Sequence, residues 1–212
     1  MLISEKIALL RLNPEKGRPY LDLSPDVLYT SFLVDLFLRG NISYNDKNKK
    51  KIKIITMETN NPLLNEPLNN LLTKKEGTGA SHNIQTAISL LNRGSGPFSE
   101  REIYKHFINE GFLRDETIKH PKLYFNQEDV QQNLISDIKK TTLGMDKPDV
   151  ADYFVLRMLK MGHLLKRYFS KPEIQEIKEL LKKDLIQIGI EVNMADLIRS
   201  IIKDLRRRNR VH

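Results

Sequence analysis

The order of apolar and polar positions predicts a chain built mostly of helices. Ser4 is a predicted N-cap, and the apolar positions that follow it form a first helix that Asn13-Pro14 ends. A second helix begins at Ser24-Pro25-Asp26, with proline at the first helical position. Further predicted helices cover 60–68, 99–109, 128–142, 149–169, 172–188 and 193–207. The predicted loops are 15–19, 74–81 and 94–97.

Two predicted β-hairpins each follow a helix that a glycine ends. Gly40 precedes a hairpin over 41–55, and Gly111 precedes a second hairpin with 122–125 as its returning strand. The helix before Gly111 begins with a capping box at 99–102. Helix, glycine and hairpin thus occur twice, which indicates a weak internal duplication of a winged-helix-like unit.

The segment 149–169 differs from the other predicted helices because apolar residues cover most of its circumference. A helix that is apolar on nearly every side is usually buried. A chain of 212 residues is long enough for one substantial core and short for two independent domains. We therefore predict a mainly α fold: a single helical domain over 1–212 around this buried central helix, with short β-hairpins on the periphery.

Charge and cysteine content restrict the possible partners. The chain has 35 Lys and Arg against 27 Asp and Glu, and its net charge of +8 favours nucleic acid, an anionic bilayer or an acidic protein. It has no cysteine, which excludes disulfides and fits a reducing compartment. The apolar runs are much shorter than the roughly 20 residues that span a bilayer, and the first residues lack the order of a signal peptide. We expect a cytoplasmic protein whose membrane contact is peripheral, on the cytosolic face.

No pattern in the sequence predicts catalysis. The histidines lack the spacing of metal ligands. They are His82, His106, His120, His163 and His212. The glycines of 76–80 have no preceding strand and no following Lys-Ser or Lys-Thr pair, as a phosphate loop requires. We predict a protein that is not an enzyme and has no cofactor and no metal site.

Two clusters of basic residues are candidates for contact with an anionic surface. The first is the tip of the first hairpin, where the predicted basic surface comprises Lys49, Lys50 and Lys51. The second is the basic C-terminal end, 203–212. A basic residue near an anionic bilayer contributes about 1 kcal/mol to binding. Solvated turns and tails have the same composition, so that alternative stays open.

Five motifs resemble, in the same order, those of the Golgi phosphoprotein 3 family. They are LISEKIALL at 2–10, NPEKG at 13–17, LVDLFLRGNI at 33–42, NPLLNEPL at 61–68 and FINEGFL at 107–113. The resemblance is clearest over 2–169. It implies a helical peripheral membrane protein that binds phosphatidylinositol 4-phosphate, serves as an adaptor and associates with itself through an exposed hairpin, here 113–125. Because the chain begins directly at the domain, it is similar to the bacterial members.

The resemblance also implies a lipid pocket made of one tryptophan and several arginines. The tryptophan position corresponds to Tyr20, whereas three arginine positions correspond to Tyr29, Pro97 and Glu100, which carry no positive charge. Other arginines close to these positions in the sequence are Arg18, Arg93 and Arg101. We predict that these three arginines and Tyr20 bind an anionic lipid headgroup.

Two other functions are compatible with the sequence. A nucleic-acid-binding protein with two winged-helix-like units is the first alternative, although Glu100, Glu102 and Glu110 give its candidate recognition helix an acidic character. The second alternative is a protein scaffold whose basic patches bind an acidic partner.

Overall fold

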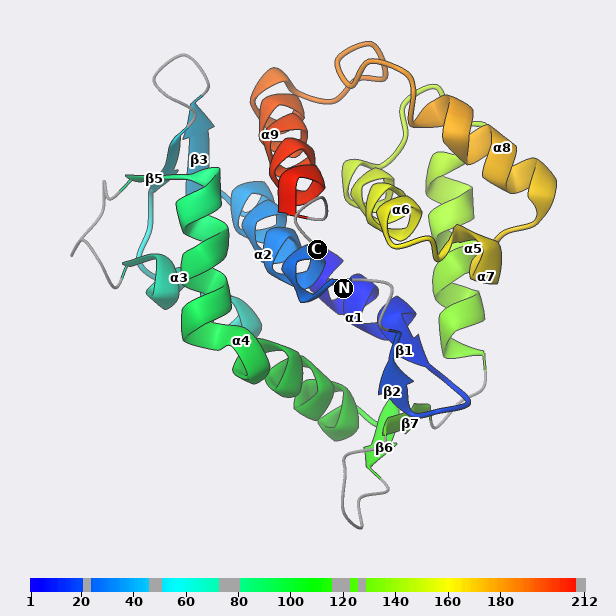
Figure 1. Cartoon of the computed structure of the whole chain (residues 1–212), viewed down its shortest axis with the longest axis horizontal. Coiled ribbons are helices and arrows are strands. Elements are labelled where there is room, and N and C mark those ends of the chain that lie inside the picture. Colours follow the sequence, from blue (N-terminus) through cyan, green and yellow to red (C-terminus); the bar gives the residue numbers. More distant parts are fainter. Residues whose placement is uncertain (21–23, 46–50, 73–80, 116–122, 126–128, 209–212) are drawn as a thin grey trace. The chain divides into compact units, whose positions relative to one another are not determined.

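The computed structural model describes residues 1–20, 24–45, 51–72, 81–115, 123–125 and 129–208, without the side chains of 25, 45 and 93–101. Helices predominate and the short strands pair antiparallel, which confirms the predicted mainly α fold (Figure 1). The chain divides into two compact units. Unit 1 comprises Met1–Ser24 and Glu100–Gly189, and unit 2 comprises Pro25–Ser99 and Ile190–His212. That the whole chain forms one domain stays a prediction.

Unit 1 is built around the helix α6, which contacts both α1 and α5. Its elements are α1 (Ile3–Arg11), β1 (Leu12–Asn13), β2 (Arg18–Pro19), β6 (Leu113–Asp115), β7 (Leu123–Phe125), α5 (Val130–Thr142), α6 (Val150–Met161), α7 (Leu165–Tyr168), α8 (Lys171–Leu180) and the end of α4 (Ile84–Asn109). The α6 side chains of Tyr153, Phe154 and Met158 are fully buried. This helix is the buried one that its apolar circumference predicted.

Three boundaries in unit 1 differ from the predictions. The first helix begins at Ile3, before Ser4, because the Glu5 side chain accepts a hydrogen bond from the backbone N–H of Leu2 and caps the helix there. The predicted helix 149–169 is interrupted, since His163 adopts a left-handed conformation with φ of 57° and the chain turns into α7. The helix predicted over 172–188 ends at Leu180, and a series of turns follows it.

The segment predicted as a loop over 15–19 contains β2, which pairs with β1. Gly17 has a φ of 61°, and its carbonyl accepts a hydrogen bond from Leu123 N at 2.9 Å. A side chain at this position would approach that same nitrogen to 3.1 Å. Only glycine satisfies both the backbone conformation and the close approach of β7.

Unit 2 packs α2 and α9 against a three-stranded antiparallel sheet in the order β3-β4-β5. Its elements are α2 (Pro25–Leu38), β3 (Ile42–Asn45), β4 (Lys51–Ile54), α3 (Pro62–Leu72), β5 (Ser81–Asn83), α9 (Val192–Arg208) and the beginning of α4. The Tyr44 and Ser200 hydroxyls, 2.7 Å apart, join β3 to α9. The strand β5 was not predicted, because Ser81 ended a polar segment without alternation.

The two helices before the hairpins end in the same way, as predicted. Gly40 and Gly111 are left-handed, with φ of 73° and 76°. One residue later, the N–H groups of Asn41 and Phe112 donate to carbonyls five positions earlier in the chain, both at 2.9 Å. This is the Schellman arrangement that a glycine stop favours. The hairpin tips, 46–50 and 116–122, lie outside the described residues.

The prediction of a loop at 94–97 and of a new helix at Ser99 was wrong, because α4 is continuous. Glycine costs about 1 kcal/mol and proline about 3 kcal/mol in a helix interior. On both sides of this segment the helix buries large side chains, Leu91 before it and Phe107 after it. That burial offsets the unfavourable local propensity.

Candidate anion-binding site

Unit 1 contains a pocket of about 400 Å³ with aromatic, polar and basic walls, which we call the Tyr20 pocket. It is lined by Pro14, Tyr20, Phe125, Gln131, Gln132, Ile135, Ser136, Lys139, Arg167 and Tyr168. Two of these side chains are cationic, and none of the described residues that line the pocket is acidic. Such a lining favours an anion over a neutral or cationic ligand.

Tyr20 is held at the pocket by the β1–β2 hairpin. Its backbone N–H donates to the carbonyl of Arg11 at 2.8 Å, immediately beyond the strand pairing. The turn itself is closed by Asn13, whose side chain accepts from the backbone N–H groups of Glu15 and Lys16 at 2.9 and 3.1 Å. The aromatic ring therefore projects from a short but well hydrogen-bonded hairpin.

Arg167 of α7 lies over the ring of Tyr20, with its guanidinium carbon 4.1 Å from the ring centroid. The predicted helix is interrupted at His163, and the chain then turns into α7. Arg167 lies on α7, four residues after His163. A guanidinium donates hydrogen bonds in its own plane, so packing on an aromatic face orients its donor groups. Arg167 is thereby suited to bind two oxygens of a phosphate or carboxylate.

Lys139 of α5 is the second cation of the pocket, and a carboxylate holds it. Its ammonium is 2.8 Å from Glu173 Oε1 and lies 5.4 Å from the centroid of the Phe169 ring. The hydrogen bond from Lys139, together with those from the backbone and hydroxyl of Ser170, lowers the pKa of Glu173 to about 2. Glu173 is therefore ionised at neutral pH and neutralises part of the Lys139 charge.

The floor of the Tyr20 pocket is fixed to the end of α1. Gln131 Nε2 donates to the carbonyls of Leu9 and Leu12 at 2.6 and 2.8 Å, and the Tyr168 hydroxyl donates to the carbonyl of Leu10. These side chains donate to carbonyls at and just beyond the end of α1, where intrahelical donors run out. Burial raises the pKa of Tyr168 far above its usual range, and the nearby Tyr20 raises it further. The phenol therefore stays protonated and continues to donate.

Of the predicted headgroup residues, the structure places Tyr20 in this pocket. Arg18 is exposed on β2 and is not one of the lining residues. The side chains of Arg93 and Arg101 lie outside the described residues, as do those of Pro97 and Glu100. Tyr29, at one of the arginine positions of the family, is buried with 3% exposure, so it does not present a polar group to a ligand.

Sequence reasoning missed Lys139, Arg167 and Tyr168. A signal for Arg167 and Tyr168 was the run of two basic and two aromatic residues in Lys166-Arg167-Tyr168-Phe169, which begins four positions after a possible helix stop at Gly162. The predicted helix 149–169 includes this segment, so its side chains were expected in the core.

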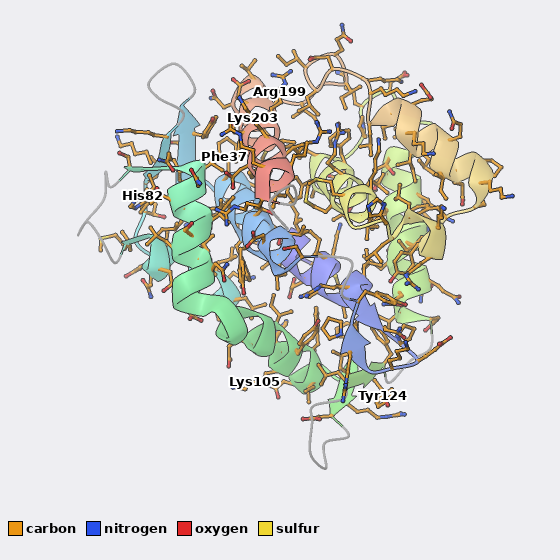
Figure 2. The ribbon with its side chains drawn as sticks, in the orientation of Figure 1. Phe37, His82, Lys105, Tyr124, Arg199 and Lys203 are labelled. Carbon is orange, nitrogen blue, oxygen red and sulfur yellow. The ribbon has the colours of Figure 1, made fainter. Side chains whose placement is uncertain are left out.

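The basic surplus of the chain belongs mainly to unit 2. Its sequence has 15 Lys and Arg against 9 Asp and Glu, whereas unit 1 has 20 against 18. A second hollow, of about 190 Å³, occurs here beside Lys203 and Arg207 of α9. Figure 2 shows Lys203 together with Arg199 on this helix.

Not all of the predicted basic residues are available to a ligand. Arg208 is bound to Asp204 at 2.7 Å and to Asp26 at 3.3 Å. Lys51 is exposed at the start of β4. Lys49, Lys50 and the end of the C-terminal cluster, 209–212, lie outside the described residues.

The described histidines have individual surroundings and form no common site. His82 is buried and its Nε2 lies 2.7 Å from the carbonyl of Leu71, while His106 Nε2 lies 3.3 Å from Glu5 Oε1. In the described parts of the chain, no three His, Cys, Asp or Glu side chains group as metal ligands. A search of those same parts finds no helix that is both long and apolar enough to traverse a bilayer.

Comparison with curated proteins finds no match. The family model described as Golgi phosphoprotein 3 (GPP34) matches residues 3–200, which is nearly the whole chain. This match extends beyond 2–169, the part in which the motifs were clearest. The chain belongs to the Golgi phosphoprotein 3 family.

Proposed function

We propose that the protein is a peripheral membrane protein that binds the phosphate of an anionic lipid headgroup in the Tyr20 pocket and catalyses no reaction. The observation that carries this proposal is the stacking of Arg167 on Tyr20 at 4.1 Å, with Lys139 in the same pocket. A guanidinium fixed in this way binds two phosphate oxygens, and a nearby ammonium adds charge. Family membership supports a lipid as the source of the phosphate, because the family is known for lipid binding.

The finer proposal is phosphatidylinositol 4-phosphate as the ligand. A phosphate monoester has a charge near −2 at neutral pH, and Arg167 and Lys139 supply positive charge for it, of which Glu173 neutralises part at Lys139. In this proposal the positive charge comes from Lys139 on α5 and Arg167 on α7, in place of the family's arginines. The protein would act as an adaptor on the cytosolic face of a membrane and associate with itself through the hairpin 113–125.

Titration calorimetry with the soluble headgroup of this lipid tests the pocket. Arg167→Gln removes a charged donor pair, and we expect a loss of at least about tenfold in affinity, since a hydrogen bond to a charged group contributes roughly 1.5–3 kcal/mol. Tyr20→Ala removes the ring that orients the arginine and should cost about fivefold.

Arg114→Gln is the matched control for Arg167→Gln. Arg114 on β6 also lies over a tyrosine, Tyr124, at 5.9 Å, but neither residue lines the Tyr20 pocket (Figure 2 shows Tyr124). We expect no change in affinity for this variant. Equal losses for Arg114→Gln and Arg167→Gln would mean that the headgroup binds through diffuse charge, and would refute the site.

Nucleic acid remains the alternative partner, because unit 2 has a surplus of basic residues. Co-sedimentation with vesicles, with and without phosphoinositide, and a duplex-DNA shift at the same salt concentration distinguish the two. We expect binding to the phosphoinositide vesicles. Binding to DNA with a steep salt dependence, and none to anionic vesicles, would reverse the assignment.

A further inference from the structure

The end of α2 and the segment after β4 form a fixed surface in unit 2. The carbonyl of Asn41 accepts from the N–H groups of Ile55 and Thr56, at 2.9 and 3.3 Å. Its side-chain amide donates to Thr56 Oγ1 at 2.8 Å and to the carbonyl of Glu58 at 2.9 Å. These four hydrogen bonds hold the residues after β4 beside the glycine turn that ends α2.

Three large apolar side chains are exposed on this surface, which we call the Asn41 patch. They are Leu38, Ile55 and Met57, with 45%, 43% and 50% of their surface exposed. Phe37, which Figure 2 labels, is partly exposed beside them in the sequence. Hydrogen bonds fix the backbone after β4, so Ile55 and Met57 do not belong to a loop that could fold over and bury them.

The charged residues next to the Asn41 patch are mostly basic. Arg39 follows Leu38, and Lys53 is exposed on β4 two positions before Ile55, while Glu58 is the one exposed acid of the described segment 51–58. Apolar side chains bordered by long basic ones are typical of surfaces that lie in the interface of an anionic bilayer.

We infer that the Asn41 patch inserts its apolar side chains into the interfacial layer of an anionic bilayer. Three partly exposed side chains provide much less area than the roughly 800 Å² per partner of a stable protein interface. They are nevertheless sufficient for partition into lipid, where each buried methylene adds independently to the binding free energy. The neighbouring basic residues complement the anionic headgroups. This contact lies in unit 2 and requires no ligand in the Tyr20 pocket.

Tryptophan fluorescence tests the inference directly, because the chain contains no tryptophan. Met57→Trp places a single fluorophore in the patch. With vesicles of phosphatidylcholine and phosphatidylserine, we expect its emission to shift to shorter wavelength and brominated acyl chains to quench it. Unchanged emission on vesicles that sediment with the protein would overturn the inference.

Met145→Trp is the matched control, because Met145 has nearly the same exposure as Met57, 48%. Its surroundings are more acidic: Asp146, Glu176 and Glu179 line the same hollow, with Lys183 as its one cation among the described lining residues. We expect this tryptophan to remain in water on the same vesicles. Equal quenching of both variants would mean non-specific adsorption and would refute the patch.

A double variant, Ile55→Ser with Met57→Ser, separates this inference from the proposed function. Both positions are exposed, so the midpoint of urea unfolding should not change. We expect about fivefold to tenfold weaker partition into anionic vesicles, as expected for partial loss of two apolar contacts, and unchanged affinity for the soluble headgroup. Unchanged partition of the double variant would refute the patch without affecting the proposed pocket. A blue shift of Met57→Trp emission that occurs without vesicles and depends on protein concentration would assign the surface to self-association.

Discussion

Replacing Lys6 by methionine should destabilise unit 1 by leaving a buried carboxylate without its cation. Lys6 on α1 forms an ion pair with Asp152 on α6, and the side chains are only 17% and 5% exposed. Thr141 Oγ1 donates to the other oxygen of Asp152 at 2.6 Å. In Lys6→Met this hydroxyl would still donate to the carboxylate in the core, but α1 and α6 would lose the ion pair that joins them.

The expected loss is about 3 kcal/mol of unfolding free energy. Breaking a buried ion pair from one side costs roughly 3–5 kcal/mol, and the partial exposure of Lys6 places this pair at the lower end. Lys6→Met with Asp152→Asn should recover about 1 kcal/mol, because the amide is neutral and still accepts from Thr141. The matched control is Lys140→Met, which breaks an exposed pair with Asp137, at 3.2 Å, and should cost less than about 0.5 kcal/mol.

Urea unfolding followed by circular dichroism measures these free energies at neutral pH. We expect a large loss for Lys6→Met, a partial recovery in the double variant and almost no loss for Lys140→Met. If Lys6→Met cost no more than the exposed control, or if the second substitution increased the loss, the buried pair would not have the energetic role described here.

Three further predictions concern the pocket and the chain that forms it. His163→Gly should raise the unfolding free energy by about 1 kcal/mol, because glycine adopts the left-handed conformation without strain; a decrease in urea midpoint would contradict this. Gln131→Met should cost about 2 kcal/mol, since the side-chain hydrogen bonds to the carbonyls of Leu9 and Leu12 are lost, and a neutral effect would show that water replaces them. Glu173→Gln should lower stability by about 1 kcal/mol at neutral pH after allowance for solvent screening, yet raise headgroup affinity about threefold by freeing Lys139. The pKa of Glu173 is lowered from 4.5 to about 2 in the folded protein, so its stabilisation is complete above pH 4.5 and is lost as the pH falls towards 2. The unfolding free energies of the parent and of Glu173→Gln should therefore converge in acid. A difference between them that stays constant with pH would be inconsistent with the ion pair.

The parts of the fold that could be predicted are those that local chemistry determines. Gly40 and Gly111 end helices because they adopt a conformation that other residues avoid, so both hairpins could be placed from the sequence. The apolar circumference of α6 likewise predicted its burial. The continuity of α4 could not be predicted, since it depends on packing at residues that lie on both sides of a proline and two glycines.

The candidate site was only partly predictable for the same reason. Tyr20 could be placed by its distance from a motif, but Arg167 reaches it from a helix more than 140 positions later in the chain, and only after His163 breaks the regular helix. Gly162 is a local signal for that break, but the left-handed residue is His163, and histidine has no preference for this conformation comparable to that of glycine. The cations of the pocket are therefore a property of the tertiary structure.

The most direct test of the account is to observe where a headgroup binds, by nuclear magnetic resonance of the tyrosine rings during titration with the soluble headgroup of phosphatidylinositol 4-phosphate. We expect saturable shifts of the Tyr20 and Tyr168 rings, which line the pocket, with no shift of Tyr124, which lies beside Arg114 outside it. Saturable shifts of the Tyr44 ring, whose hydroxyl contacts Ser200 at the hollow beside Lys203 and Arg207, with Tyr20 unaffected, would contradict the proposed site and assign anion binding to unit 2.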